Sequence, residues 1–197
     1  RGDKAVLCIV NDDRAVRPEG DPARKLNIEI QGMLYAYDSA QNPALNNTVF
    51  INYRIRNQSA NDYQDVYLGN FTDFDLGFRF DDYVGCDTQR DLFYSYNGRN
   101  QDGVSGGYGE TPPSVGGAFL STPLNSFVAY ENNFSTTGNP ETAFDFYNYL
   151  RGFWKDSTAM TVGGDGYQSS DDTTRFLFSG DPQESGEWHG GCRPFQL

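Results

Sequence analysis

An acidic segment near the middle of the chain is the feature that most constrains its fold. Residues 70–87, NFTDFDLGFRFDDYVGCD, contain five aspartates and one basic side chain, Arg79. Carboxylates this close repel one another, so a fold that gathers them must leave each in water or place a cation among them. The Asp-x-Asp-x-Gly run from Asp73 to Gly77 favours a cation, because Ca²⁺ takes about six to eight oxygen ligands and glycine lets a loop bend around it.

We therefore predict a structural calcium site. The segment is not an EF-hand, because no glutamate stands at the twelfth position and the flanks read as strands. The alternative is that these carboxylates cap turns and face water. Further oxygen ligands occur in NGRNQDG, residues 97–103. The candidate ligands are Asp73, Asp75 and Asp87, then Asp81 and Asp82, and in the second segment Asn97, Asn100 and Asp102.

The net charge limits the classes of partner. Fifteen Lys and Arg against 27 Asp and Glu give −12, which repels nucleic acid and anionic lipid head groups. No apolar stretch approaches the roughly 18 to 20 residues of a membrane span, so we expect no membrane insertion. The first residues, RGDKAVLCIV, lack the layout of a signal peptide, and we expect any such signal to have been removed. Cations, glycans and other proteins remain as partners.

Strand patterns follow one another closely. Residues 26–37 and 48–57 alternate apolar and polar side chains, and a further extended segment is expected over 64–77. The short links leave little room for crossover helices, which favours antiparallel pairing. With 22 glycines and many aromatic residues, the chain is expected to form a single mostly β domain over residues 1–197, an antiparallel β-sandwich-like fold with long, ordered Gly- and Asp-rich loops.

Two further segments have a distinct character. Residues 97–117 hold seven glycines and two prolines, which predicts an ordered loop rather than a helix or strand. One amphipathic helix is expected to begin with Asn139 as its cap and Pro140 in its first turn. Apolar side chains follow at three- and four-residue spacing as far as Trp154. Gly152 is expected to loosen the end of that helix.

The sequence identifies no catalytic residue. His189 is the only histidine, so a His-dependent triad would have to include it and a zinc site built from several histidines is excluded. Paired carboxylates for glycoside hydrolysis stay open, because acidic residues are plentiful. A sugar-stacking platform also stays open, although such rings more often belong to the core. The aromatic candidates are Tyr35, Tyr37, Tyr94, Tyr96, Tyr130, Tyr147, Tyr149, Trp154 and Trp188.

Three cysteines, Cys8, Cys86 and Cys192, permit one disulfide and leave one thiol. We favour a Cys86–Cys192 pair.

Several short motifs occur in a fixed order along the chain. They are Asp-x-Asp-x-Gly, Asp-Asp-x-x-Gly-Cys-Asp at 81–87, Tyr-Asn-Gly at 96–98, Gly-Tyr-Gly-x-x-Pro-Pro at 107–113, Tyr-Asn-Tyr at 147–149 and Gly-Asp-Pro at 180–182. Together they resemble a module of large secreted Bacteroidetes proteins, which leave the cell by the type IX secretion system. The resemblance covers residues 26–194. It implies an extracellular or cell-surface location, a sorting domain beyond this chain, and a chain that is a piece of a longer protein.

In such a lineage, Asp-Ser-Ala, Asp-Ser-Thr and Asp-Thr-Thr resemble acceptor motifs for O-glycans. They would place a glycan on Ser39, Ser157 and Thr173. The sequence as a whole predicts a non-enzymatic structural or adhesive surface module stabilised by calcium, with other proteins of a larger surface assembly, or copies of itself, as partners. The alternative is a carbohydrate-active module that binds glycans or hydrolyses them with paired carboxylates.

Overall fold

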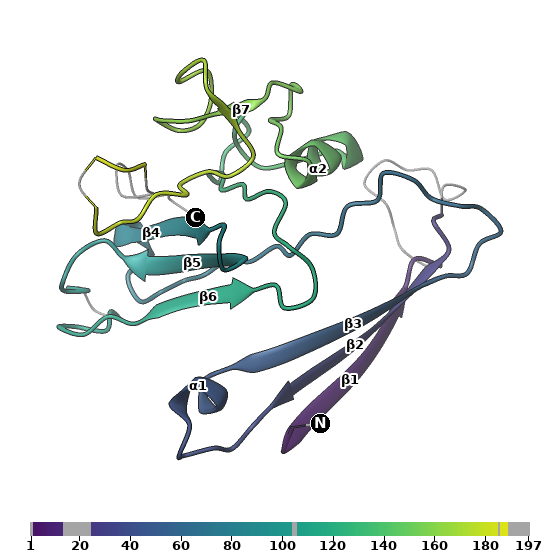
Figure 1. Cartoon of the computed structure of the whole chain (residues 1–197), viewed down its shortest axis with the longest axis horizontal. Helices are drawn as coiled ribbons and strands as arrows, with labels where there is room; N and C mark the ends of the chain where they lie inside the picture. The colour runs from purple at the N-terminus through teal and green to yellow at the C-terminus, as the bar shows by residue number, and fades with distance from the viewer. Residues whose placement is uncertain (1, 14–24, 104–105, 185, 189–197) are drawn as a thin grey trace. The chain divides into compact units, whose positions relative to one another are not determined.

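Antiparallel strands dominate the protein (Figure 1), which confirms the mostly β prediction. The computed structural model describes residues 2–13, 25–103, 106–184 and 186–188. The chain forms two compact units, Arg1–Val66 and Tyr67–Leu197.

The first unit is a three-stranded antiparallel sheet. Strands β1 (Lys4–Asn11), β2 (Ile28–Ala36) and β3 (Val49–Asn57) pair in chain order. A four-residue helix, α1 (Pro43–Asn46), connects β2 to β3, and the side chain of Asn42 caps it. The alternating segments at 26–37 and 48–57 thus form strands as predicted, whereas β1 was not predicted.

The register of this sheet separates two kinds of side chain. Residues directly opposite one another on the three strands share a face, because side chains alternate along a strand. One face is apolar at its centre, with the rows Val6–Leu34–Ile51 and Val10–Ile30–Ile55. On the other face, the rings of Tyr35 and Phe50 stack with their centroids 5.3 Å apart.

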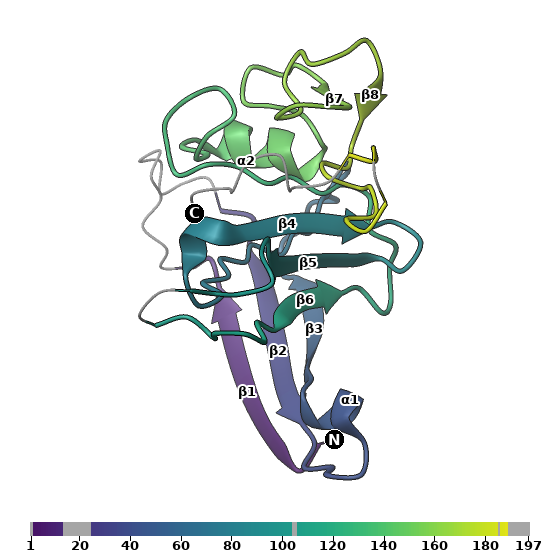
Figure 2. The same ribbon diagram turned by 90° about the vertical axis from the view of Figure 1, so that its left-hand side faces the viewer.

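The second unit contains another three-stranded antiparallel sheet (Figure 2). Strands β4 (Asp82–Asp87), β5 (Leu92–Asn97) and β6 (Ser114–Ala118) pair in chain order, and a 3₁₀ turn, η1 (Arg79–Asp81), leads into β4. Two short strands, β7 (Met160–Thr161) and β8 (Thr173–Thr174), form a separate antiparallel pair.

Strand β6 corrects part of the loop predicted over 97–117. Its two glycines lie opposite large rings of β5, Gly116 against Tyr94 and Gly117 against Phe93. A Cβ on Gly116 would lie 2.5 Å from the Phe93 carbonyl oxygen, and one on Gly117 would lie 2.6 Å from the Phe93 ring. Glycine is used in this strand because the backbone and the ring of Phe93 occupy the space that side chains at 116 and 117 would need.

The extended segment expected over 64–77 contains no strand. Its aromatic side chains pack on other rings of the second unit instead. Tyr67 meets Tyr147 edge-on at 5.6 Å between centroids, and Phe74 stacks on Phe93 at 6.2 Å. Side-chain packing without backbone pairing therefore holds this part of the chain in place.

The amphipathic helix forms, but it is shorter than predicted. Helix α2 spans Ala143–Leu150, and its cap is Thr142 in a capping box with Asp145, not Asn139. Each side chain of the box accepts a hydrogen bond from the other residue's backbone N–H, which satisfies two otherwise unpaired donors. Gly152 has φ +78 just after the helix, in the left-handed region that glycine favours.

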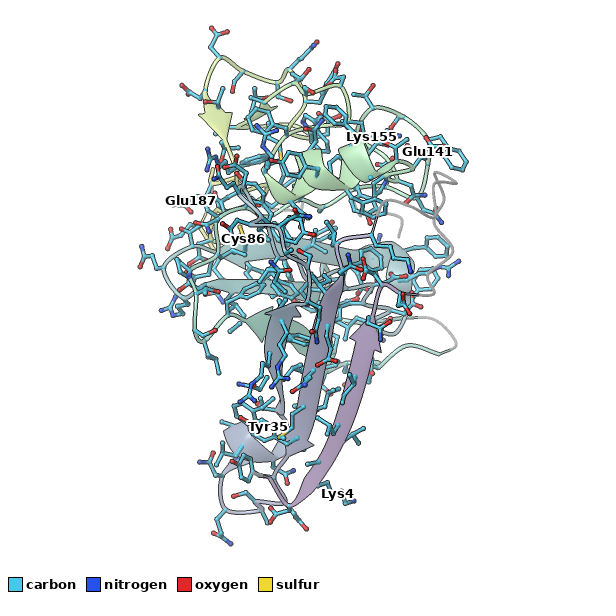
Figure 3. The ribbon with its side chains drawn as sticks, turned by 90° about the vertical axis from the view of Figure 1, so that its right-hand side faces the viewer. Lys4, Tyr35, Cys86, Glu141, Lys155 and Glu187 are labelled. Carbon is cyan, nitrogen blue, oxygen red and sulfur yellow. The ribbon has the colours of Figure 1, made fainter. Side chains whose placement is uncertain are left out.

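The hydrophobic core of the second unit joins its sheet to the segments after α2. The Trp154 indole N–H donates to the Gly166 carbonyl at 2.9 Å, so this buried ring is also satisfied as a donor. Lys155 and Glu141 lie side by side near the helix (Figure 3), with Nζ 3.3 Å from Oε2. The buried core residues are Val84, Tyr149, Trp154, Met160, Leu177 and Phe178.

No helix among the described residues combines the length and apolar character needed to cross a bilayer.

Candidate cation site

The two segments predicted to hold calcium meet at one end of the β4–β5 pair. Asp82 begins β4 and lies directly opposite Asn97, the last residue of β5, so their side chains share a face of the sheet. The pairing extends by one residue, because the Gly98 N–H donates to the Asp81 carbonyl at 2.7 Å. What the sequence presented as two separate sites is therefore one region.

Two buried aspartates accept hydrogen bonds from the backbone of the Asp-x-Asp-x-Gly turn and of the residue after it. The Leu76 N–H donates to Asp82 Oδ2 at 3.0 Å, and the Phe78 N–H donates to Asp102 Oδ1 at 3.1 Å. The second oxygen of Asp102 accepts the Tyr108 N–H at 2.6 Å. Asp82 and Asp102 thus anchor the turn to β4 and to the loop that follows β5.

Gly77 is required at the centre of this turn. Its φ is +70, and a Cβ there would overlap the carboxylate of Asp102. The Asp-x-Asp-x-Gly run was expected to bend at its glycine, and it does so at Gly77, where the backbone packs against the carboxylate of Asp102.

Several polar atoms in this region are sealed from water without a hydrogen bond. Asp81 is 8% exposed and Asp82 is 2% exposed. Such atoms are rare in native proteins, and each costs roughly 1–3 kcal/mol when it has no partner, more when it is charged. The atoms among the described residues are Asp81 Oδ1, Asp82 Oδ1, Asn97 Oδ1 and Ser95 Oγ.

The electrostatic surroundings act on Asp82. Burial, helped by the negative charges of Asp81, Asp102 and Asp75 and opposed by the hydrogen bond from Leu76, raises the pKa of Asp82 to about 6. The ionised form of Asp82 is therefore disfavoured at this position. A cation would reverse that preference, because opposite charge stabilises the ionised carboxylate.

The available ligands are hard oxygens of mixed type. Among the described residues, no three His, Cys, Asp or Glu side chains form a group that could hold a metal ion by themselves. A cation here would use the carboxylates of Asp81 and Asp82 together with the Asn97 amide oxygen, the Ser95 hydroxyl and water. Ca²⁺ accepts such mixed sets of carboxylates, carbonyl oxygens and waters.

The aspartates ranked first from the sequence lie elsewhere. Asp73 and Asp75 are exposed. Asp87 Oδ1 accepts the Gln89 and Arg90 N–H groups at 2.9 and 3.0 Å, and its Oδ2 pairs with the Arg90 guanidinium. This ion pair and the backbone hydrogen bonds hold the pKa of Asp87 below its usual value. Asp87 thus has the turn-capping geometry that the sequence left open as the alternative to a metal.

Sequence reasoning did not single out Ser95. It lies on β5 two residues before Asn97, and so on the same face of the sheet as Asn97 and Asp82. In the alternating segment LFYSYN, the serine occupies a buried position of the strand. That position could be recognised as part of the site only once the partner strand was known.

A surface cavity of about 360 Å³ borders this site. Asp81 forms part of its wall and also carries one of the buried oxygens without a partner. Asn100, a predicted ligand, is exposed and faces the cavity rather than the sealed oxygens. The lining residues are Phe78, Asp81, Arg99, Asn100, Gln101 and Gly103.

The remaining candidates lie outside this region. Cys86 is a buried thiol that donates to the Leu177 carbonyl with an S–O distance of 3.4 Å, and burial raises its pKa to about 12 (Figure 3). Its suggested partner Cys192 lies outside the described residues, as does His189, so the disulfide stays a prediction. Cys8, the third cysteine, is an exposed free thiol.

The three suggested O-glycan acceptors differ in exposure. Ser157 and Thr173 are exposed, whereas Ser39 is half-buried. Ser157 Oγ also accepts a hydrogen bond from the Asn148 side chain at 3.2 Å.

The chain matches no known protein family, no curated protein and no solved structure. Its function is therefore inferred from its own residues.

Proposed function

We propose that this chain is a non-enzymatic structural or adhesive module, exported to the cell surface or beyond, in which a calcium ion joins the 75–82 and 97–102 segments. The observation that carries the proposal is the set of buried oxygens without partners on Asp81, Asp82 and Asn97. An isolated buried carboxylate is costly, and a divalent cation removes the cost from two of them at once.

The ion would contribute directly to folding stability. The turn that includes Gly77 is held by Asp82 and Asp102, so relief of repulsion among these carboxylates strengthens the attachment of the turn to β4 and β5. A ligand that binds the folded chain and not the unfolded chain adds its binding free energy to the free energy of unfolding.

The proposed location agrees with this chemistry. Calcium sites of extracellular modules commonly have dissociation constants of about 10⁻⁴ to 10⁻³ M, which suits a site with few carboxylates. The net charge of −12 and the resemblance to modules of the type IX secretion system also support an extracellular role. The buried aspartates hold a turn in place, which is a structural use of carboxylates.

Thermal unfolding tests the proposal. The melting temperature is measured at neutral pH with a chelator and then with Ca²⁺ at about ten times the dissociation constant, where the expected stabilisation is about 1.4 kcal/mol. For a chain of this size, that corresponds to about 2–6 °C. The variant Asn97→Ala should lose most of the response, whereas Asp62→Asn, at an exposed position in the first unit, should keep it. An unchanged melting temperature in both conditions would remove the calcium site.

A further inference from the structure

The cavity beside the cation site has the lining of a small polar binding pocket. Its volume, about 360 Å³, lies at the small end of ligand pockets in proteins. Phe78 gives it an aromatic wall, and this ring is held edge-on against Phe80 with centroids 5.3 Å apart. The Arg79 guanidinium lies over the other ring, 4.9 Å from the centroid of Phe80. The aromatic wall is therefore held by two further contacts.

The polar groups of the cavity offer both hydrogen-bond donors and acceptors. Arg99 provides donors only, Asn100 and Gln101 provide donors and acceptors, and the Asp81 carboxylate provides acceptors. A ligand that pairs with all of them needs groups that both donate and accept, and hydroxyl groups do so. A pyranose ring adds an apolar face of C–H groups that can pack on Phe78.

The charge around the cavity argues against an anionic ligand. Asp81 forms part of the wall, and the next residue in the chain, Asp82, is a second buried carboxylate. A neutral ligand avoids this repulsion, whereas a carboxylated or sulfated ligand would meet it with Arg99 as the one basic residue in the lining.

We propose that this cavity binds a neutral saccharide and that the bound calcium ion makes the site competent by fixing Asp81. The proposal rests on the calcium site proposed above. Asp81 belongs to both features, because its Oδ1 is one of the buried oxygens without a partner while the residue lines the cavity. Its backbone is already held, with the Asp81 N–H donating to Phe78 at 3.2 Å and the Asp81 carbonyl accepting from Gly98 at 2.7 Å.

The cation therefore acts on the side chain of Asp81 rather than on its backbone. Without the ion, repulsion from Asp82 favours rotation of the Asp81 carboxylate away from the cluster and into the space of the cavity. With the ion, the carboxylate is held on the inner side and the cavity stays open. Saccharide affinity should consequently fall at least tenfold on chelation.

The test is a binding screen on the complete chain. An array of neutral mannose, galactose, glucose and N-acetylglucosamine oligosaccharides is probed with Ca²⁺ and with chelator, and each positive saccharide is then titrated calorimetrically. Arg99→Ala and Gln101→Ala change exposed cavity residues and should each weaken binding about tenfold while leaving the calcium-dependent melting shift intact. Gln183→Ala, exposed and outside the lining, is the matched control and should bind as the unaltered chain does.

The outcomes separate the two proposals. A calcium-dependent melting shift without saccharide binding overturns the cavity proposal and leaves the calcium site standing. Saccharide binding that survives chelation overturns the role given to Asp81. Loss of both responses overturns the calcium site as well. Binding of lysine-rich peptides instead of saccharides, at the same residues, would show that the Asp81 carboxylate binds basic groups of a partner protein. That result would refute the saccharide proposal.

Discussion

Replacement of Asp82 by asparagine should have opposite effects on stability in the absence and in the presence of calcium. Asparagine has nearly the same shape as aspartate, and its amide oxygen can still accept the hydrogen bond from Leu76 that Asp82 Oδ2 accepts at 3.0 Å. The substitution removes one negative charge from a group that includes Asp75, Asp81 and Asp102. The Asp82 carboxylate that carries this charge is also one of the proposed calcium ligands.

The size of the effect follows from the titration of Asp82. A carboxyl whose pKa rises from 3.8 to about 6 on folding destabilises the folded state by at most about 3 kcal/mol at neutral pH. Solvent screening reduces this limit, and we expect Asp82→Asn to stabilise the chelated protein by about 1–2 kcal/mol. That is an increase of about 2–8 °C in melting temperature for a chain of this size.

Calorimetric unfolding at neutral pH, with chelator and with saturating Ca²⁺, measures both effects in one series. In calcium, the variant should melt below the unaltered chain, because it has lost a charged ligand. Asp62→Asn removes a charge at an exposed position and should change little in either condition. A variant that is less stable than the unaltered chain in chelator would refute the claim that the Asp82 charge destabilises the folded protein in the absence of calcium.

Three further predictions concern the same unit. In chelator, the free energy of unfolding of the unaltered chain should fall as pH rises from about 4 to about 6.5, because the folded state holds a proton on Asp82 that the unfolded state has lost. Denaturant titrations across this pH range should show the decrease, and Asp82→Asn should remove most of it. Gly77→Ala should cost at least about 2 kcal/mol, from its φ of +70 and overlap with Asp102, and a denaturation midpoint equal to that of the unaltered chain would contradict this. Native Cys86 should resist alkylation at pH 8 while the exposed Cys8 reacts, as peptide mass spectrometry would show; rapid labelling of Cys86 would contradict its burial.

The sequence predicted those parts of the fold that depend on local pattern. The strands around Ile30 and Ile51 were recognisable because apolar and polar side chains alternate there. Helix α2 was recognisable from the spacing of its apolar side chains. Its start was misplaced because the capping box of Thr142 and Asp145, rather than Asn139, begins the helix.

Strand β6 could not have been predicted from its own residues. Two glycines disfavour a strand by propensity, and here they are needed because the carbonyl and the ring of Phe93 on the paired strand fill the space beside them. Long-range contacts thus override local preference. Strand β1 was likewise missed, although KAVLCIVN is rich in apolar and β-branched residues.

The candidate site was predicted in composition and not in arrangement. The sequence indicated which side chains supply oxygen, and it included Asp81, Asp82 and Asn97 among them. It ranked the exposed Asp73 and Asp75 first, because a motif records spacing along the chain and not burial. Only the pairing of β4 with β5 shows that the two segments meet.

The most direct test of the central claim is an anomalous difference map from crystals grown with Ca²⁺. We expect a peak within about 2.3–2.6 Å of carboxylate oxygens of Asp81 and Asp82 and of the amide oxygen of Asn97. A well-ordered map in which these oxygens point apart into water, with no ion between them, would contradict the account.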